Sequence, residues 1–277
     1  MIKDIVVNLS VREGGKSTGD YAVSIASALE AHIAGVAFVY DPNVPASSGT
    51  AYISVEAIEA VRRDHEIAAK VAIDRFVKAT SRAGVSAEPL TLTTRFDETG
   101  DQFGRIARCF DLAIVGQAKP EPSAAEEKIA ESALFGSGRP VIFVPYIQKA
   151  PLKLDRVMVC WDGSRPAVRA IADAMPLLER AGNVEVVIVA NERGKREEID
   201  GADMGQHLAR HGLNVEVRRI TRDDTDVADT LLSHAADAGT DFIVMGGYGH
   251  SRLREFVFGG VTRSMLRSMT VPVLMSH

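Results

Sequence analysis

The sequence predicts an α/β fold of two tandem doubly wound domains, each with a five-stranded parallel sheet. Short apolar runs alternate with helical patterns along the whole chain, which is typical of βαβ units. The pattern also occurs twice. Three pairs of segments resemble each other: 5–9 and 157–161, 111–116 and 241–246, and 139–144 and 271–275. We therefore expect two repeats, residues 1–146 and residues 154–277.

Each expected element follows from the periodicity of its apolar residues. Strands are expected near 3–9, 33–39, 86–92, 112–116 and 140–145, and again near 155–161, 184–190, 214–220, 241–246 and 271–275. Helices are expected near 18–31, 55–83, 98–108 and 124–136, and again near 165–181, 200–211, 226–238 and 259–268. A linker from Ile147 to Leu154 joins the two halves.

The first half is longer, and most of its excess is an insertion at residues 42–84. A turn-rich loop opens this insertion, and a long helix that ends at Gly84 follows it. The apolar stripe of the helix contains Ile58, Val61, His65, Ala68, Ala72 and Phe76. Such stripes usually face a core, so a helix packed on the sheet is favoured over a lid or an interaction arm.

The composition excludes several classes of protein. Of the 277 residues, 46% are hydrophobic and 25% are charged, which argues against a disordered or fibrous chain. A net charge of −5 without a run of Lys and Arg argues against nucleic-acid binding. No segment has the roughly 20 apolar residues of a membrane span, and the N-terminus lacks a secretory signal. We expect a cytoplasmic protein in which Cys109 and Cys160 are buried free thiols.

The segment from Asp241 to Pro272 predicts a binding site, because an apolar strand leads into a glycine-rich loop and then a helix. Its glycines are Gly246, Gly249, Gly259 and Gly260. Glycine lets a ligand approach the backbone, and a helix N-terminus attracts anions, so the pattern favours phosphate. The loop after residue 161 contains Asp162, whose carboxylate would lie at the same edge of the sheet.

The spacing Gly246-x2-Gly249-x9-Gly259, with Met245 before it and Val261-Thr262 after it, resembles the nucleotide-binding signature of the universal stress proteins. The resemblance covers both halves and is stronger in residues 154–277. It implies a stress-response protein that binds ATP, with or without Mg²⁺, as a regulatory ligand. The implied nucleotide-binding positions are Asp162, Val189, Ala190, Met245, Gly246, Gly249, His250, Gly259, Gly260, Val261 and Thr262.

The resemblance also implies an internal pseudo-dimer. Family members pair through their last strands, so segments 141–144 and 271–274 are expected near the interface between the halves. A single chain and a homodimer both stay open, and the resemblance identifies no protein partner.

The chain departs from the family pattern at several positions. Gly260 stands where a phosphate-binding Ser, Thr or Asn is usual, and His250 stands where Arg or Lys is frequent, although Arg252 or Arg254 could replace that charge. The first half departs further. It has Ser10 in place of Asp162, Gln117-Ala118-Lys119-Pro120 after Gly116, and Glu127-Lys128 in place of Gly259-Gly260. A carboxylate repels phosphate, so we expect no ATP site in the first half.

Other signals are weaker. Residues 13–18 resemble a Walker A loop, but Ser10 replaces its leading glycine, and a loop in which Ser17 or Thr18 caps the first helix is favoured. His207 and His211 are four residues apart on an expected helix but lack an evident third metal ligand. No nucleophile elbow or carboxylate pair is evident, so neither a metal site nor a catalytic site is predicted. A binding protein is favoured, and a module without nucleotide or a slow ATPase remain the alternatives.

Overall fold

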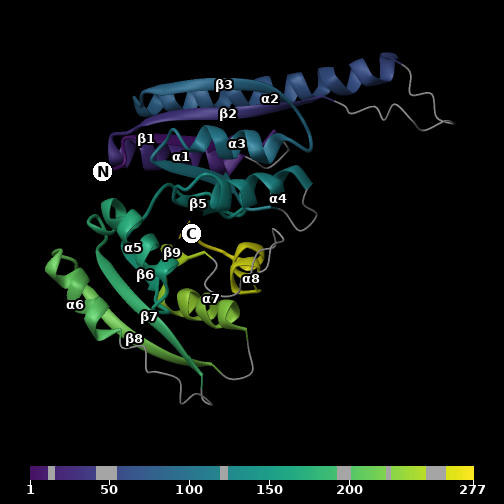
Figure 1. Ribbon diagram of the computed structural model, residues 1–277. Helices are drawn as coiled ribbons and strands as arrows, with labels where there is room; N and C mark the ends of the chain where they lie inside the picture. Colours follow the sequence, from purple (N-terminus) through teal and green to yellow (C-terminus); the bar gives the residue numbers. More distant parts are fainter. Residues whose placement is uncertain (12–15, 42–54, 119–123, 192–200, 223–225, 248–259) are drawn as a thin grey trace.

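The computed structural model describes the chain except for residues 12–15, 42–54, 119–123, 192–200, 223–225 and 248–259 (Figure 1). The first half contains β1 (Asp4–Asn8), α1 (Lys16–Leu29), β2 (His32–Asp41), α2 (Val55–Ala83), β3 (Ala87–Arg95), α3 (Thr99–Ala107), β4 (Leu112–Gly116), α4 (Ala124–Glu131), the π-helix η1 (Ser132–Gly136) and β5 (Val141–Val144). The second half contains β6 (Arg156–Cys160), α5 (Arg165–Leu178), β7 (Asn183–Asn191), α6 (Ala202–Arg210), β8 (Val215–Arg222), α7 (Val227–Ala238), β9 (Phe242–Gly246), α8 (Gly260–Ser268) and β10 (Val273–Ser276).

The strands form one sheet rather than two separate ones. Its order is β3-β2-β1-β4-β5-β10-β9-β6-β7-β8, with parallel pairing inside each half. At the centre β5 pairs antiparallel with β10, so that Ile142 lies opposite Leu274. The α/β class and the five parallel strands per half are confirmed. The expected contact between the two last strands is also seen, and it merges the two sheets into one (Figure 1).

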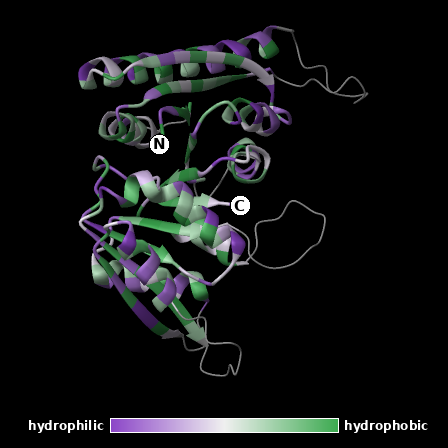
Figure 2. Ribbon diagram, turned by 60° about the vertical axis from the view of Figure 1, so that its left-hand side comes forward, coloured by the Kyte–Doolittle hydropathy of each residue, from purple (hydrophilic) through white to green (hydrophobic). Residues whose placement is uncertain are grey.

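Helices cover both faces of the sheet and enclose two apolar cores. One core collects side chains from α1, α2, α5 and α6, such as Ile25 and Ile171. The other collects side chains from α3, α4, α7 and α8, such as Phe103 and Met265. The inner parallel strands such as β1, β4 and β9 are covered on both faces, which explains why their sequences are nearly continuous apolar runs (Figure 2).

Helix α2 packs on the sheet with only part of its length. Its Phe76 is buried against Gly35, where an added Cβ would lie 2.7 Å from the Phe76 ring. It ends as predicted before Gly84, whose φ is +65°. Figure 1 shows that its N-terminal part extends beyond the sheet, and there Val61 is 45% exposed despite its place in the predicted stripe. The Nδ1–H of His65 donates to the Tyr40 carbonyl oxygen at 3.0 Å, which fits its expected structural role.

Three expectations were wrong. Helix α1 begins at Lys16, so Ser17 and Thr18 lie inside the helix rather than at its cap. The segment expected as one helix at 124–136 changes to a π-helix at Ser132. Cys109 is exposed, because it follows the end of α3 instead of packing beneath it.

Among the described residues, no helix is long and apolar enough to cross a membrane.

Candidate functional site

The strand order places a topological switch point in the middle of the second half. Strand β6 lies between β7 and β9, and the chain leaves β6 towards β7 through α5. Cys160 at the end of β6 lies beside Met245 of β9 on one side and Val187 of β7 on the other. Ligands of open α/β sheets bind at the carboxyl ends of strands that flank such a point. The loops after β6 and β9 therefore border the candidate site.

Asp162 is held at this edge by a tight turn. Its Oδ1 accepts a hydrogen bond of 2.9 Å from the backbone N–H of Ser164, and Gly163 between them has a φ of +73°. The Ser164 hydroxyl then accepts from the N–H of Ala167 at 3.3 Å and caps α5. The turn orients an exposed carboxylate at the carboxyl end of β6.

Gly246 brings the second loop close to the first. A Cβ at this position would lie 2.5 Å from the backbone nitrogen of Ala167 and 2.7 Å from the carbonyl carbon of Pro166. Only glycine allows the first turn of α5 to approach the end of β9 so closely. The loop that carries Asp162 and the start of the glycine loop are therefore packed against each other.

The other predicted positions fall into three groups. Met245 is buried, whereas Val189 and Ala190 are partly exposed near the end of β7. Gly260 is the exposed first residue of α8, followed by the half-buried Val261 and the buried Thr262. The remaining three, Gly249, His250 and Gly259, lie outside the described residues. Because α8 connects β9 to β10, it begins at the same carboxyl edge.

The neighbouring thiol is not a nucleophile at neutral pH. Burial raises the pKa of the Cys160 thiol to about 12, and the negative charge of Asp162 adds to the shift. A thiol needs its thiolate form to react, so Cys160 stays inert. Trp161, the one tryptophan of the sequence, lies between Cys160 and Asp162 and provides a fluorescent probe of this edge.

The corresponding edge of the first half is built differently. Gly116 ends β4 as Gly246 ends β9. A Cβ added to Gly116 would lie 2.8 Å from the side-chain hydroxyl of Thr18, whereas a Cβ added to Gly246 would meet backbone atoms. The next residue is the buried Gln117, whose side chain contacts α8 of the second half. The sequence showed that a motif glycine was missing here, but no local pattern revealed that contact.

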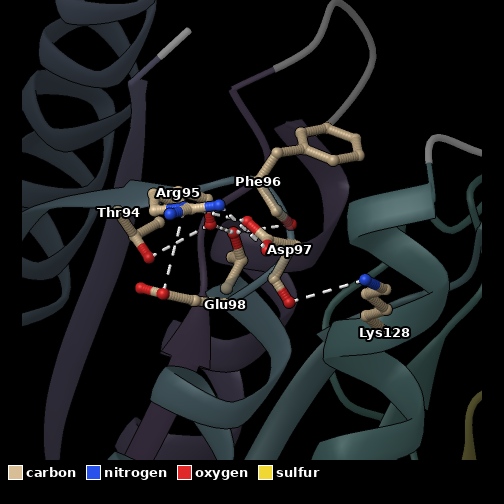
Figure 3. Close-up of polar contacts among 7 residues, drawn as sticks. Thr94, Arg95, Phe96, Asp97, Glu98 and Lys128 are labelled. Carbon is tan, nitrogen blue, oxygen red and sulfur yellow. Dashed lines mark hydrogen bonds and ion pairs between the residues drawn. The ribbon is translucent and has the colours of Figure 1, made fainter. Parts of the chain in front are cut away.

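Helices α3 and α4 of the first half pack closely against each other. A Cβ on Gly100 would lie 2.6 Å from the Lys128 carbonyl oxygen, so the two backbones nearly touch. Figure 3 shows Lys128 reaching the turn after β3, where its Nζ donates to the Asp97 carbonyl at 3.4 Å. A hydrogen bond from the backbone N–H of Asp97, with the Arg95 guanidinium adding, lowers the pKa of that carboxyl. Glu127 and Lys128 thus lie on a helix instead of in a glycine loop.

A hollow with a volume of about 650 Å³ lies at the opposite edge of the second half, between α7 and the amino ends of β6, β7 and β8. Its half-buried Glu185 is already engaged at both oxygens. Oε1 accepts from Arg218 at 2.6 Å, and Oε2 lies 2.9 Å from Nε2 of His234. Arg218 also pairs with Glu216 at 2.6 Å, so these four side chains form a polar network with a structural role.

A metal centre finds no support in the described part of the chain, where no group of three His, Cys, Asp or Glu side chains could hold an ion. His207 and His211 pack edge to face with their ring centres 4.8 Å apart.

Comparison with known proteins agrees with this geometry. The strand order and its switch point define an α/β protein of the doubly wound type. The sequence profile described as the universal stress protein family matches residues 153–277, and these residues form a universal stress protein domain. The profile match does not include the first half.

Relatives show how far the likeness extends. A universal stress protein of Synechocystis is 23% identical over 171 residues, which make up 60% of this chain and 57% of that protein. A universal stress protein from Archaeoglobus fulgidus has a TM-score of 0.70 at 17% identity, over 99% of this chain and 97% of its own. A functionally unknown protein from Pseudomonas aeruginosa PAO1 has a TM-score of 0.60 at 10% identity, over 99% and 92%. The fold is therefore shared over the whole chain.

Proposed function

We propose that the second half binds an adenine nucleotide, with ATP as the preferred ligand, as a regulatory signal. The observation that carries this proposal is the close packing of Gly246 against the first turn of α5, beside the turn that holds Asp162, at the switch point of the second half. The first half, in this proposal, is a diverged second copy of the domain that has given up the site.

Each part of the edge has a distinct role in the proposed complex. The Asp162 carboxylate accepts hydrogen bonds from the ribose hydroxyls, and backbone groups at Val189 and Ala190 contact adenine. The N–H groups at the start of α8 face the phosphates, since a helix N-terminus carries free donors and a partial positive charge. This backbone donation compensates for Gly260, which supplies no side-chain hydroxyl. Mg²⁺, if bound, would be held mainly by the phosphates.

Binding tests this proposal directly. Freshly purified protein is first checked by mass analysis for small molecules that purify with it, and then stripped of ligand. Titration with ATP, with and without Mg²⁺, is followed by calorimetry and Trp161 fluorescence. Saturable heat and a raised melting temperature are expected. If neither effect occurs at millimolar nucleotide, the domain is an interaction module that binds no nucleotide.

Two variants separate loss of the site from loss of the fold. Gly259→Glu should abolish ATP binding without unfolding the protein, because it places a negative charge among the phosphate donors. Unchanged affinity in that variant would mean that the site lies elsewhere. Slow hydrolysis is tested separately: phosphate release that is no faster in wild type than in Asp162→Ala excludes Asp162-dependent turnover.

A further inference from the structure

Gln117 joins the first half to the helix that carries the proposed phosphate site. Its side-chain Nε2 donates to the carbonyl oxygens of Leu266 at 3.0 Å and Arg267 at 3.1 Å, in the last turn of α8. Its Oε1 accepts from the backbone N–H of Tyr146 at 3.2 Å. Every polar group of the amide is therefore used in a side chain that is only 8% exposed.

These contacts require an amide. The last carbonyls of a helix lack partners within the helix, and two N–H donors on one nitrogen can satisfy two of them. Reversing the amide would turn Oε1 towards two carbonyl oxygens, so the partners themselves fix its orientation. The backbone is fixed too, because the Gln117 N–H donates to the Val144 carbonyl at 2.7 Å.

The second half shows what this position does without such a side chain. Gly247 follows β9 as Gln117 follows β4, and its N–H donates to the Ser276 carbonyl at 2.8 Å. A Cβ added to Gly247 would lie 3.1 Å from the Leu134 side chain. Leu134 and Leu266 occupy equivalent positions, because each lies six residues before the proline that precedes the last strand of its half. The two contacts are thus related by the internal pseudo-symmetry. One is a polar cap on α8, and the other is a glycine packed beneath a leucine.

We infer that Gln117 is a positioning residue for the nucleotide site, through which the first half sets the placement of α8. The helix has only nine residues, and so short a helix depends on tertiary contacts for its stability. Buried Thr262, Met265 and Met269 fix one face of this segment, and Gln117 holds its C-terminal end. The N–H donors at Gly260 and Val261 belong to the same rigid body. This inference rests on the proposed nucleotide site.

Two substitutions and one control test the inference. Gln117→Met keeps the length of the side chain and removes its donors. Gln117→Glu places a carboxylate against two carbonyl oxygens at a helix C-terminus, which raises the pKa of the new carboxyl. Ile114→Val shortens a fully buried residue of β4 in the core opposite α8, and it controls for a general loss of stability.

Two measurements are made on each protein. Hydrogen exchange of the α8 amides is measured without nucleotide, and ATP affinity is measured at pH 8 and at pH 5.5. Both Gln117 variants should exchange faster in α8 and bind ATP about tenfold more weakly at pH 8. Gln117→Glu should regain affinity relative to wild type at pH 5.5, where its protonated carboxyl donates again, whereas Gln117→Met should not. Ile114→Val should leave both measurements unchanged.

The outcomes separate the inference from the function on which it rests. Exchange and affinity equal to wild type in both Gln117 variants would overturn the inference, as would faster exchange with unchanged affinity. An equal loss of affinity in Ile114→Val would also overturn it, because general stability would then account for the effect. A third outcome is that the wild type binds no ATP while the Gln117 variants still exchange faster in α8. That outcome would contradict the proposed function and would retain Gln117 as a cap of α8.

Discussion

The carboxyl edges of the two halves share a backbone plan and differ in what lies over it. In each half a glycine ends the fourth strand and lets the first helix approach, yet Gly246 lies against backbone whereas Gly116 lies against the Thr18 side chain. The second edge leads into α8, whose first residue Gly260 is exposed, and the first edge continues into the buried Gln117, whose side chain binds carbonyls of α8. The difference teaches that equivalent strand ends can serve different purposes, because the first one supports a helix of the other half.

The largest expected effect compares the two strand-ending glycines. Gly246→Ala should destabilise the protein by about 3 kcal/mol, because the new Cβ would force the backbone of α5 to move. Gly116→Ala should cost about 1 kcal/mol, since a hydroxyl can rotate away from the new Cβ. Urea unfolding of both variants measures the difference. Equal midpoints would mean that the two close approaches are equivalent.

The next largest effect on stability compares Leu134 with Leu266, which are related by the internal pseudo-symmetry. Leu134→Ala should cost about 3 kcal/mol, because the side chain is 2% exposed and its removal leaves a cavity above Gly247. Leu266→Ala should cost about 1 kcal/mol, because Leu266 is only half-buried and its carbonyl still accepts from Gln117. Thermal and urea unfolding give both values. A larger loss at Leu266 would contradict the assigned packing.

A smaller effect distinguishes Asp162 from its counterpart Ser10. Asp162→Asn should weaken ATP binding about tenfold by removing the negative charge, while the Asn carbonyl preserves the turn to Ser164 and the melting temperature. Ser10→Asp should not create a second site, because the first half has Glu127-Lys128 in place of Gly259-Gly260. Calorimetric stoichiometry checks both expectations, and two ATP molecules per Ser10→Asp chain would refute the second.

The smallest effect concerns pH and separates the partly buried Glu131 on α4 from the exposed Glu179 that ends α5. Burial, with the negative charge of Glu127 adding, raises the pKa of Glu131. A raised pKa means that the folded chain binds the proton more tightly, so stability falls as pH rises through the folded pKa. Glu131→Gln should therefore raise the melting temperature at pH 7 by about 1 °C, with no gain under acidic conditions. The same substitution at exposed Glu179 serves as the control and should change nothing.

Most of the fold could be predicted because its signals are local. Apolar runs located β4 at its observed bounds, and Gly84 marked the end of α2 correctly. The π-helix at Ser132 has no periodicity that separates it from α4, and the exposure of Cys109 depends on how α3 ends. The contact of Gln117 with α8 joins residues 149 and 150 positions apart, so no sequence window could contain it. Of the site, the positions of the strand ends were foreseen, and the nucleotide-binding roles of all the residues assigned to it remain predictions.

The antiparallel junction of β5 with β10 has a consequence for how this molecule could diverge. Were the same junction made by two identical chains, each position would occur twice, so a glutamine at the end of one fourth strand would impose a glutamine on the other. That second glutamine would meet the leucine of the opposite subunit and stand at the start of the glycine loop. Carrying both copies on one chain removes this constraint. One copy can then specialise as a support while the other keeps the loop, and the pair cannot be separated by dilution.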